Sequence, residues 1–232
     1  MQSLGQSFRA LVIGSSGAIG AAFVRALQAM PHCQEVVGLS RDTDPAFSLE
    51  DEASMAHAAQ VLQATGPFHL IVDATGVLTL GEHKPEKSLG ALNADALMRS
   101  YQLNAVGPAL LIKHCVPLLA LGQRVIYAKL SARVGSISDN HKGGWYGYRA
   151  AKAGLNMLLQ TAAIECARKR PALVMAALQP GTVASPLSQA FVAAADAITP
   201  DASVAGLLQA LDALPAQASA HFVDYRGAPI AW

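Results

Sequence analysis

The chain is built from short apolar runs that alternate with longer segments in which apolar residues recur every three or four positions. The apolar runs cover residues 8–13, 35–40, 69–74, 124–128, 172–178 and 221–225, and the helical patterns cover residues 19–30, 51–63, 94–119, 145–169 and 203–214. Strands that are apolar along nearly their whole length are typical of a parallel sheet covered by helices on both faces. The sequence shows no repeat and no linker, so we expect one doubly wound α/β domain over residues 1–232.

The composition excludes several classes of protein. Hydrophobic residues make up 52% of the chain and charged residues 14%, with 17 basic and 16 acidic side chains. This composition excludes a disordered chain and argues against a broad nucleic-acid-binding surface. The sequence has no run of 18 apolar residues and no secretory signal pattern, so we expect a cytoplasmic protein without a membrane partner. Cys33, Cys115 and Cys166 form no CxxC pair, which favours buried thiols over a disulfide framework or a zinc site.

A glycine-rich turn follows the first expected strand. It reads Gly14-Ser15-Ser16-Gly17-Ala18-Ile19-Gly20, and the first expected helix begins inside it. Glycines let the backbone approach a pyrophosphate, and the first amides of a helix attract its negative charge. The spacing is GxxGxxG instead of GxGxxG, and a turn that binds nothing would share it. Its place between the first strand and the first helix favours a dinucleotide site.

The end of the second expected strand indicates which dinucleotide is preferred. In dinucleotide folds an acidic residue there accepts a hydrogen bond from the ribose 2′-OH, whereas an arginine pairs with a 2′-phosphate. Ser40 stands at the acidic position and Arg41 follows it, which favours NADP(H) over NAD(H). The alternative is that Arg41 is an ordinary surface charge and that Asp42 takes the role of the acid.

A tyrosine and a lysine lie four residues apart at the start of a long helical pattern. This spacing places Tyr148 and Lys152 on one face of the helix. A lysine ammonium can lower the pKa of a phenol, so that the tyrosine can exchange a proton with a carbonyl oxygen near neutral pH. Tyr146 lies six residues before Lys152 and does not share that face. This spacing alone is common on helices. It indicates a catalytic pair only because it occurs in a dinucleotide-type fold.

Taken in order, these motifs resemble the short-chain dehydrogenase/reductase family over essentially the whole chain. The matching segments are Gly14 with Gly17 and Gly20, Asp73-Ala74-Thr75-Gly76, Asn104-Ala105-Val106-Gly107-Pro108, Tyr148 with Lys152, and Pro180-Gly181-Thr182-Val183-Ala184-Ser185. Residues 131–140, 143–157 and 225–232 resemble the C-factor/sniffer-like carbonyl reductases more narrowly. The resemblance implies a Rossmann-type fold. The low fraction of charged residues suggests a surface buried against another subunit, so we also expect a homodimer or homotetramer.

The resemblance also implies roles for particular residues. Asn104, a serine, Tyr148 and Lys152 would form the proton-transfer set, with Asn104 supporting a relay water. Cofactor binding is expected from the whole glycine-rich turn and from Ser40, Arg41, Leu49, Ala74, Thr75, Gly76, Asn104, Tyr148, Lys152, Pro180, Gly181, Thr182, Val183 and Ser185. Relatives often carry an adenine-binding aspartate near the end of a third strand, where this chain has Ser48.

The serine of the proton-transfer set is displaced in this chain. The family places it three residues before the glycine at 135, where this chain has Ala132. Ser131 and Ser136 are both close enough in sequence to replace it, and we favour Ser131. A chain in which neither serine is catalytic is the remaining alternative.

The sequence therefore predicts an NADP(H)-dependent carbonyl reductase or alcohol dehydrogenase in which Tyr148 is the general acid and base. A short, mostly apolar segment at residues 186–200 is expected to cover the substrate, which favours a small or medium hydrophobic carbonyl or alcohol. No GxSxG or HExxH motif supports a serine hydrolase or a metalloenzyme. The alternative is an NADP(H)-binding signalling or regulatory protein of the C-factor type, with little or no turnover.

Overall fold

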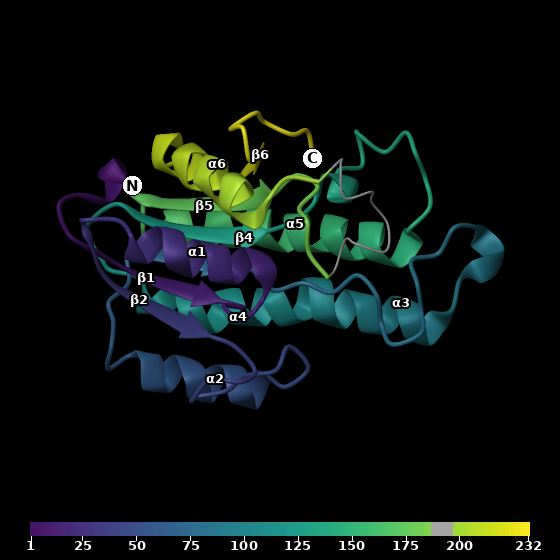
Figure 1. Ribbon diagram of the computed structural model, residues 1–232, viewed down its shortest axis with the longest axis horizontal. Helices are drawn as coiled ribbons and strands as arrows, with labels where there is room; N and C mark the ends of the chain where they lie inside the picture. The colour runs from purple at the N-terminus through teal and green to yellow at the C-terminus, as the bar shows by residue number, and fades with distance from the viewer. Residues whose placement is uncertain (187–196) are drawn as a thin grey trace.

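Six parallel strands form the central sheet of the computed structural model, which describes residues 1–186 and 197–232 (Figure 1). They are β1 (Phe8–Ile13), β2 (Cys33–Leu39), β3 (Leu70–Asp73), β4 (Val125–Leu130), β5 (Leu173–Gln179) and β6 (His221–Asp224). Their order in the sheet is β2-β1-β3-β4-β5-β6. All six strands predicted from the sequence are present. Because β1 lies between β2 and β3, the strand order reverses there, which is where folds of this type bind ligands.

Helices cover both faces of the sheet. They are α1 (Ala18–Gln28), α2 (Glu52–Leu62), α3 (Ala94–Tyr101), α4 (Gly107–Cys115), α5 (Tyr146–Ala167) and α6 (Pro200–Ala213). Residues of α1 and α6 share one apolar core with the sheet, and residues of α2, α4 and α5 share the other. In Figure 1, α1 lies beside α6, and α2 lies beyond the edge formed by β2. The predicted doubly wound α/β fold is confirmed.

The helix expected over residues 94–119 contains a wider turn near its middle. After α3, residues Gln102–Val106 form a π-helical turn, η3, and then α4 and a 3₁₀ turn, η4 (Val116–Leu118), complete the run. Such turns are rare and often occur at functional sites. Asn104 lies within η3 and is almost completely buried. The wider turn therefore occurs at a residue that the sequence singled out.

The segment between β2 and α2 differs from the family pattern. Ser48 ends no strand and forms only an isolated bridge with Asp51. Its amide donates to Ser54 Oγ at 2.9 Å, and its own hydroxyl accepts from the Glu50 amide at 3.2 Å. The local polar groups thus satisfy one another in a turn that leads into α2.

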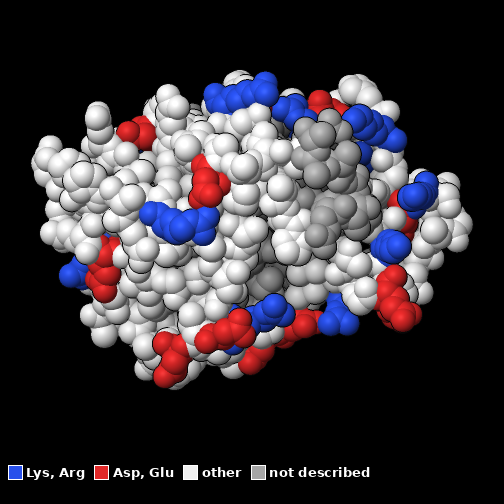
Figure 2. Space-filling view, in the orientation of Figure 1, with Lys and Arg blue, Asp and Glu red and all other residues white. Residues whose placement is uncertain are grey.

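Charged side chains are sparse on the surface shown in Figure 2, where broad uncharged areas separate them. No helix in the described residues is long and apolar enough to cross a membrane. The expected assembly with copies of itself and the expected cytoplasmic location stay predictions.

Candidate active site

The glycine-rich turn has the shape of a phosphate cradle. Gly14 has a φ of 80°, and a Cβ added to Gly20 would lie 2.1 Å from the Gly14 carbonyl oxygen. The backbone at these two positions therefore excludes any side chain. Helix α1 begins at Ala18, and its N-cap residue Gly17 supplies no side-chain hydrogen bond. The first amides of α1 are thus not capped by that side chain, and the residues present fit an anionic group such as a pyrophosphate.

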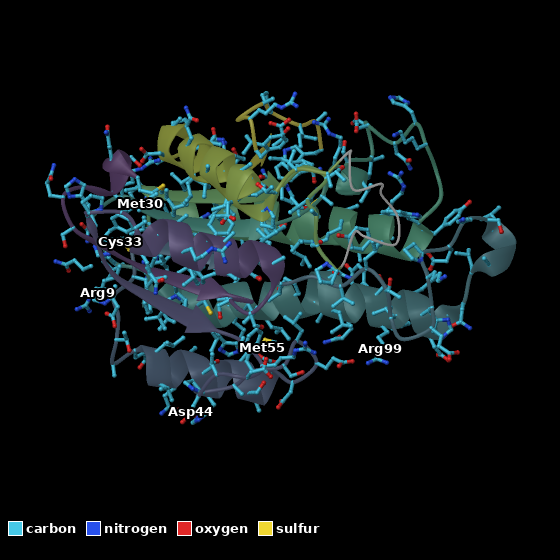
Figure 3. The ribbon with its side chains drawn as sticks, in the orientation of Figure 1. Arg9, Met30, Cys33, Asp44, Met55 and Arg99 are labelled. Atoms are coloured by element: carbon cyan, nitrogen blue, oxygen red, sulfur yellow. The ribbon has the colours of Figure 1, made fainter. Side chains whose placement is uncertain are left out.

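A groove beside this turn brings together residues far apart in the sequence. It encloses a volume of about 360 Å³. Nine predicted cofactor residues line it: Gly14, Ser16, Gly17, Ser40, Arg41, Leu49, Ala74, Thr75 and Gly76. Arg99 also lines it, extending from α3 (Figure 3) to pair with Glu50 at 3.4 Å. The nine predicted residues come from the loops after β1, β2 and β3, at the carboxyl ends of these parallel strands.

Arg41 is exposed in this groove. Among the described residues no carboxylate pairs with it, so its guanidinium is available to a ligand. Ser40 is buried, and its hydroxyl accepts a hydrogen bond from the Asp42 amide at 3.1 Å. The loop after β2 therefore presents a basic side chain to the groove.

A second cavity, of about 510 Å³, lies at the start of α5. Eight of the predicted site residues line it: Ile19, Ser131, Tyr148, Pro180, Gly181, Thr182, Val183 and Ser185. Hydrogen bonds hold the loop at 180–185: Ser203 Oγ donates to the Pro180 carbonyl at 2.6 Å, and Ile198 exchanges backbone hydrogen bonds of 2.9 Å with Thr182 and Ala184. Apolar lining from Leu78, Val134 and Trp145 was not predicted. Most of the expected lid, residues 187–196, lies outside the described residues.

The start of α5 is fixed by a loop distant in the sequence. Glu86 accepts a hydrogen bond from the Gly147 amide through its carboxylate at 3.1 Å, and from the Trp145 amide through its carbonyl at 2.5 Å. Arg149 donates to the carbonyls of Gly143 and Gly144 at 3.2 and 2.9 Å. These contacts determine the direction in which the first turn of α5 presents Tyr148.

Tyr148 and Lys152 lie together on one face of α5, as their spacing predicts. Lys152 Nζ is 5.6 Å from the centre of the Tyr148 ring and donates to the Leu130 carbonyl at 3.2 Å. Burial lowers the pKa of Lys152 to about 7, with a smaller lowering from the Lys129 ammonium. Burial also raises the pKa of Tyr148 above its ordinary value. The lowering of the Tyr148 pKa by Lys152 stays a prediction, and Tyr146 does not line the cavity.

The side chain of Asn104 forms three hydrogen bonds to the backbone. Its Oδ1 accepts from the Val77 amide at 3.0 Å, and its Nδ2 donates to the carbonyls of Val77 and Ser100 at 2.8 and 3.1 Å. Asn104 thus ties η3 to the loop after β3. A role in holding a relay water stays a prediction.

The two candidate serines occupy different surroundings. Ser131 lines the cavity of Tyr148, but its hydroxyl donates to Asn156 Oδ1 at 2.6 Å. Ser136 is buried outside that lining, and its hydroxyl accepts from the Asp139 amide at 3.1 Å. Ala132 lines the cavity and offers no hydroxyl. The preference for Ser131 as the catalytic serine stays a prediction.

One charged residue close to this site was missed by the sequence reasoning. Lys129 is fully buried in β4, and its Nζ lies 2.8 Å from Asp73 Oδ1 at the end of β3. A lysine within an otherwise apolar strand was the available signal. Its partner could not be known without the register that pairs Asp73 with Lys129.

The profile of the short chain dehydrogenase family matches residues 9–196. The chain belongs to this family of oxidoreductases. The match covers the glycine-rich turn, the loop after β3, the Tyr148–Lys152 pair and the loop at 180–185.

Two curated relatives support this membership. A 1-hydroxy-2-glutathionyl-2-methyl-3-butene dehydrogenase from Rhodococcus sp. (strain AD45) is 30% identical over 190 residues, which cover 82% of this chain and 80% of the relative. The C-signal protein of Myxococcus xanthus is 32% identical over 170 residues, which cover 72% of this chain and 95% of the relative.

Solved structures share the fold at lower sequence identity. A carbonyl reductase from chicken fatty liver, solved with NADPH bound, has a TM-score of 0.84 and 22% identity, and the match covers 98% of this chain and all of that one. The carbonyl reductase Sniffer of D. melanogaster has a TM-score of 0.83 and 20% identity, covering 97% of this chain and all of that one. The predicted resemblance to this family is confirmed.

Proposed function

We propose that this short-chain dehydrogenase transfers hydride between NADP(H) and a small or medium carbonyl or alcohol. The observation that carries the proposal is that Ile19, from the glycine-rich turn, lines the same cavity as Tyr148. A cofactor anchored at that turn would therefore reach the tyrosine. When bound, the nicotinamide supplies or accepts the hydride.

The chain's own residues would handle the proton. Tyr148 faces the cavity and would donate its hydroxyl proton to the carbonyl oxygen of the substrate during reduction, and accept a proton during oxidation. Protonated Lys152 would favour the phenolate that Tyr148 becomes, because an opposite charge nearby stabilises an ionised group. The loop at 180–185 would hold the nicotinamide end, and the apolar lining around Leu78 and Trp145 would exclude water.

Arg41 supports a preference for NADP(H) over NAD(H). Its guanidinium lines the groove beside the glycine-rich turn and is not paired with a described carboxylate. A guanidinium binds a phosphate by two parallel hydrogen bonds, and the extra 2′-phosphate distinguishes the two cofactors. Asp42, the alternative acidic residue, is exposed and does not line the groove.

A signalling or regulatory role with little turnover is the second candidate. The C-signal relative and the alanine at position 132 favour it, since Ala132 removes the hydroxyl that the family places beside the substrate. The Tyr148–Lys152 pair favours catalysis, because a protein that only binds cofactor does not need a proton donor facing the cavity.

A panel of aldehydes, ketones and quinones incubated with NADPH distinguishes the two candidates. The enzymatic proposal predicts oxidation of NADPH that depends on both protein and carbonyl. This oxidation is measured as a loss of NADPH absorbance. Tight NADPH binding without turnover of any carbonyl in the panel would favour the regulatory candidate. Absence of NADPH binding would contradict both.

A further inference from the structure

The ion pair between Lys129 and Asp73 is completely shielded from solvent. Both side chains have no exposed surface, and they occupy paired positions on the neighbouring strands β3 and β4. Lys129 Nζ donates to Asp73 Oδ1 at 2.8 Å, to the Thr75 carbonyl at 2.7 Å and to Thr75 Oγ1 at 2.9 Å. Three donors of one ammonium therefore have three acceptors. Burying such a charge is costly, and an apolar pair would often serve the sheet as well.

The backbone at residues 74–76 packs against the glycine-rich turn and lies near Lys152 and Asn104. A Cβ added to Gly14 would lie 3.1 Å from both the Ala74 carbonyl carbon and the Thr75 nitrogen, so this stretch packs against the glycine-rich turn. A Cβ added to Gly76 would lie 3.5 Å from Lys152 Nζ and 3.7 Å from Asn104 Oδ1. The loop backbone at 74–76 thus lies between the phosphate cradle and the residues expected to move the proton.

We propose that Lys129 is a positioning residue, which holds the loop at 73–77 in the shape that joins the cofactor groove to Lys152 and Asn104. The proposal rests on the proposed function, because the residues it positions are those of the hydride-transfer site. Lys129 has no exposed surface and acts through Thr75 and not on the substrate.

Charge supplies a second line of support for the same role. The titratable groups that face Lys152 in the described part of the chain are Lys129 from β4, Asp73 from β3 and Tyr148 from α5, while Asn104 on η3 is neutral. The Lys129 ammonium lowers the pKa of Lys152 and the Asp73 carboxylate raises it, with the effect of Lys129 the larger. Removing both charges should therefore raise the pKa of Lys152.

The test uses a paired variant because a single change leaves an unpaired buried charge. Lys129→Met alone leaves the buried Asp73 carboxylate without its cationic partner and is expected to destabilise the fold. In the double variant Asp73→Asn/Lys129→Met, the Asn oxygen can still accept from Thr75, but the ammonium that held the Thr75 carbonyl is gone. Lys113→Met is the matched control, since Lys113 is an exposed lysine that pairs with Glu52 on the surface.

The double variant should remain folded but bind NADPH at least fivefold more weakly and transfer hydride at least tenfold more slowly than the wild type. The ionisation assigned to Lys152 in its pH–rate profile should move to higher pH. Wild-type affinity, rate and pH profile in a folded double variant would show that the ion pair is only structural. Lys113→Met should match the wild type.

A second variant decides the matter if the double variant does not fold. Thr75→Val keeps the ion pair and the side-chain shape but removes the hydroxyl that accepts from Lys129 and donates to Asp73. Because Thr75 also lines the cofactor groove, the rate of hydride transfer is measured at saturating NADPH. A rate at least threefold slower supports the positioning role, and an unchanged rate overturns it. Wild-type protein that neither binds NADPH nor oxidises it with any carbonyl would instead count against the proposed function.

Discussion

Lys152 places a positive charge where almost no solvent reaches, and this charge lowers the stability of the fold. Its pKa is about 7 in the folded protein and 10.5 ordinarily, with burial as the main cause. The folded state therefore resists protonation between these values. The loss of folding stability caused by the buried ammonium is greatest below pH 7 and disappears as the pH rises towards 10.5.

Lys152→Met should consequently stabilise the protein at pH 6 while abolishing hydride transfer. A shift of this size would raise the melting temperature by on the order of 5 °C or more at pH 6, and by much less at pH 10. Thermal unfolding of both proteins at the two pH values measures it. A lower melting temperature of the variant at pH 6 would contradict the buried-charge account.

The displaced serine is tested by two separate alanine variants. If Ser131 or Ser136 donates a hydrogen bond to the substrate oxygen, its alanine variant should slow single-turnover hydride transfer by roughly 10²–10³ without weakening NADPH binding. We expect the larger effect from Ser131, because Ser131 lines the cavity and Ser136 does not. If both variants keep wild-type rates, no serine has this role and catalysis depends on Tyr148 and Lys152.

At the start of α1, Gly20 has no room for a side chain. A Cβ at Gly20 would lie 2.1 Å from the Gly14 carbonyl oxygen, so Gly20→Ala must displace the backbone of the turn. We expect a loss of about 1–3 kcal/mol in the free energy of unfolding, together with weaker NADPH binding. Gly90→Ala is the control, because a Cβ there meets nothing within 4 Å. Equal denaturant midpoints for the two variants would contradict the cradle geometry.

The helices, strands and turns also show which parts of the fold could be predicted from the sequence. All six strands and the glycine-rich turn were predictable, because apolar runs and glycine spacing are local patterns. The π-helical turn at Gln102–Val106 was not, since its residues fit the pattern of an ordinary helix. The partners of Lys129 and Ser131 could not be predicted either. Asp73 and Asn156 lie 56 and 25 residues away, and these contacts depend on strand register and helix packing.

For the molecule as a whole, cofactor binding should appear as added thermal stability. NADPH at 100 times its dissociation constant adds about 2.7 kcal/mol, which corresponds to a rise of roughly 5–10 °C in a protein of this size. NADH at the same concentration should give a smaller rise. Arg41→Ala should remove the difference between the cofactors, whereas Arg25→Ala, an exposed arginine paired with Asp201, should keep it. Equal shifts for both cofactors in the wild type would contradict the preference for NADP(H).

The most direct test of the whole account is single-turnover hydride transfer from NADPH in Tyr148→Phe beside Tyr146→Phe. Tyr148 lines the cavity and lies next to Lys152, whereas Tyr146 on the same helix turn does not line it. Tyr148→Phe should slow transfer by roughly 10²–10⁴ with nearly unchanged NADPH affinity, and Tyr146→Phe should cost little. A wild-type rate in Tyr148→Phe, or the greater loss in Tyr146→Phe, would contradict the assignment of Tyr148 as the proton donor.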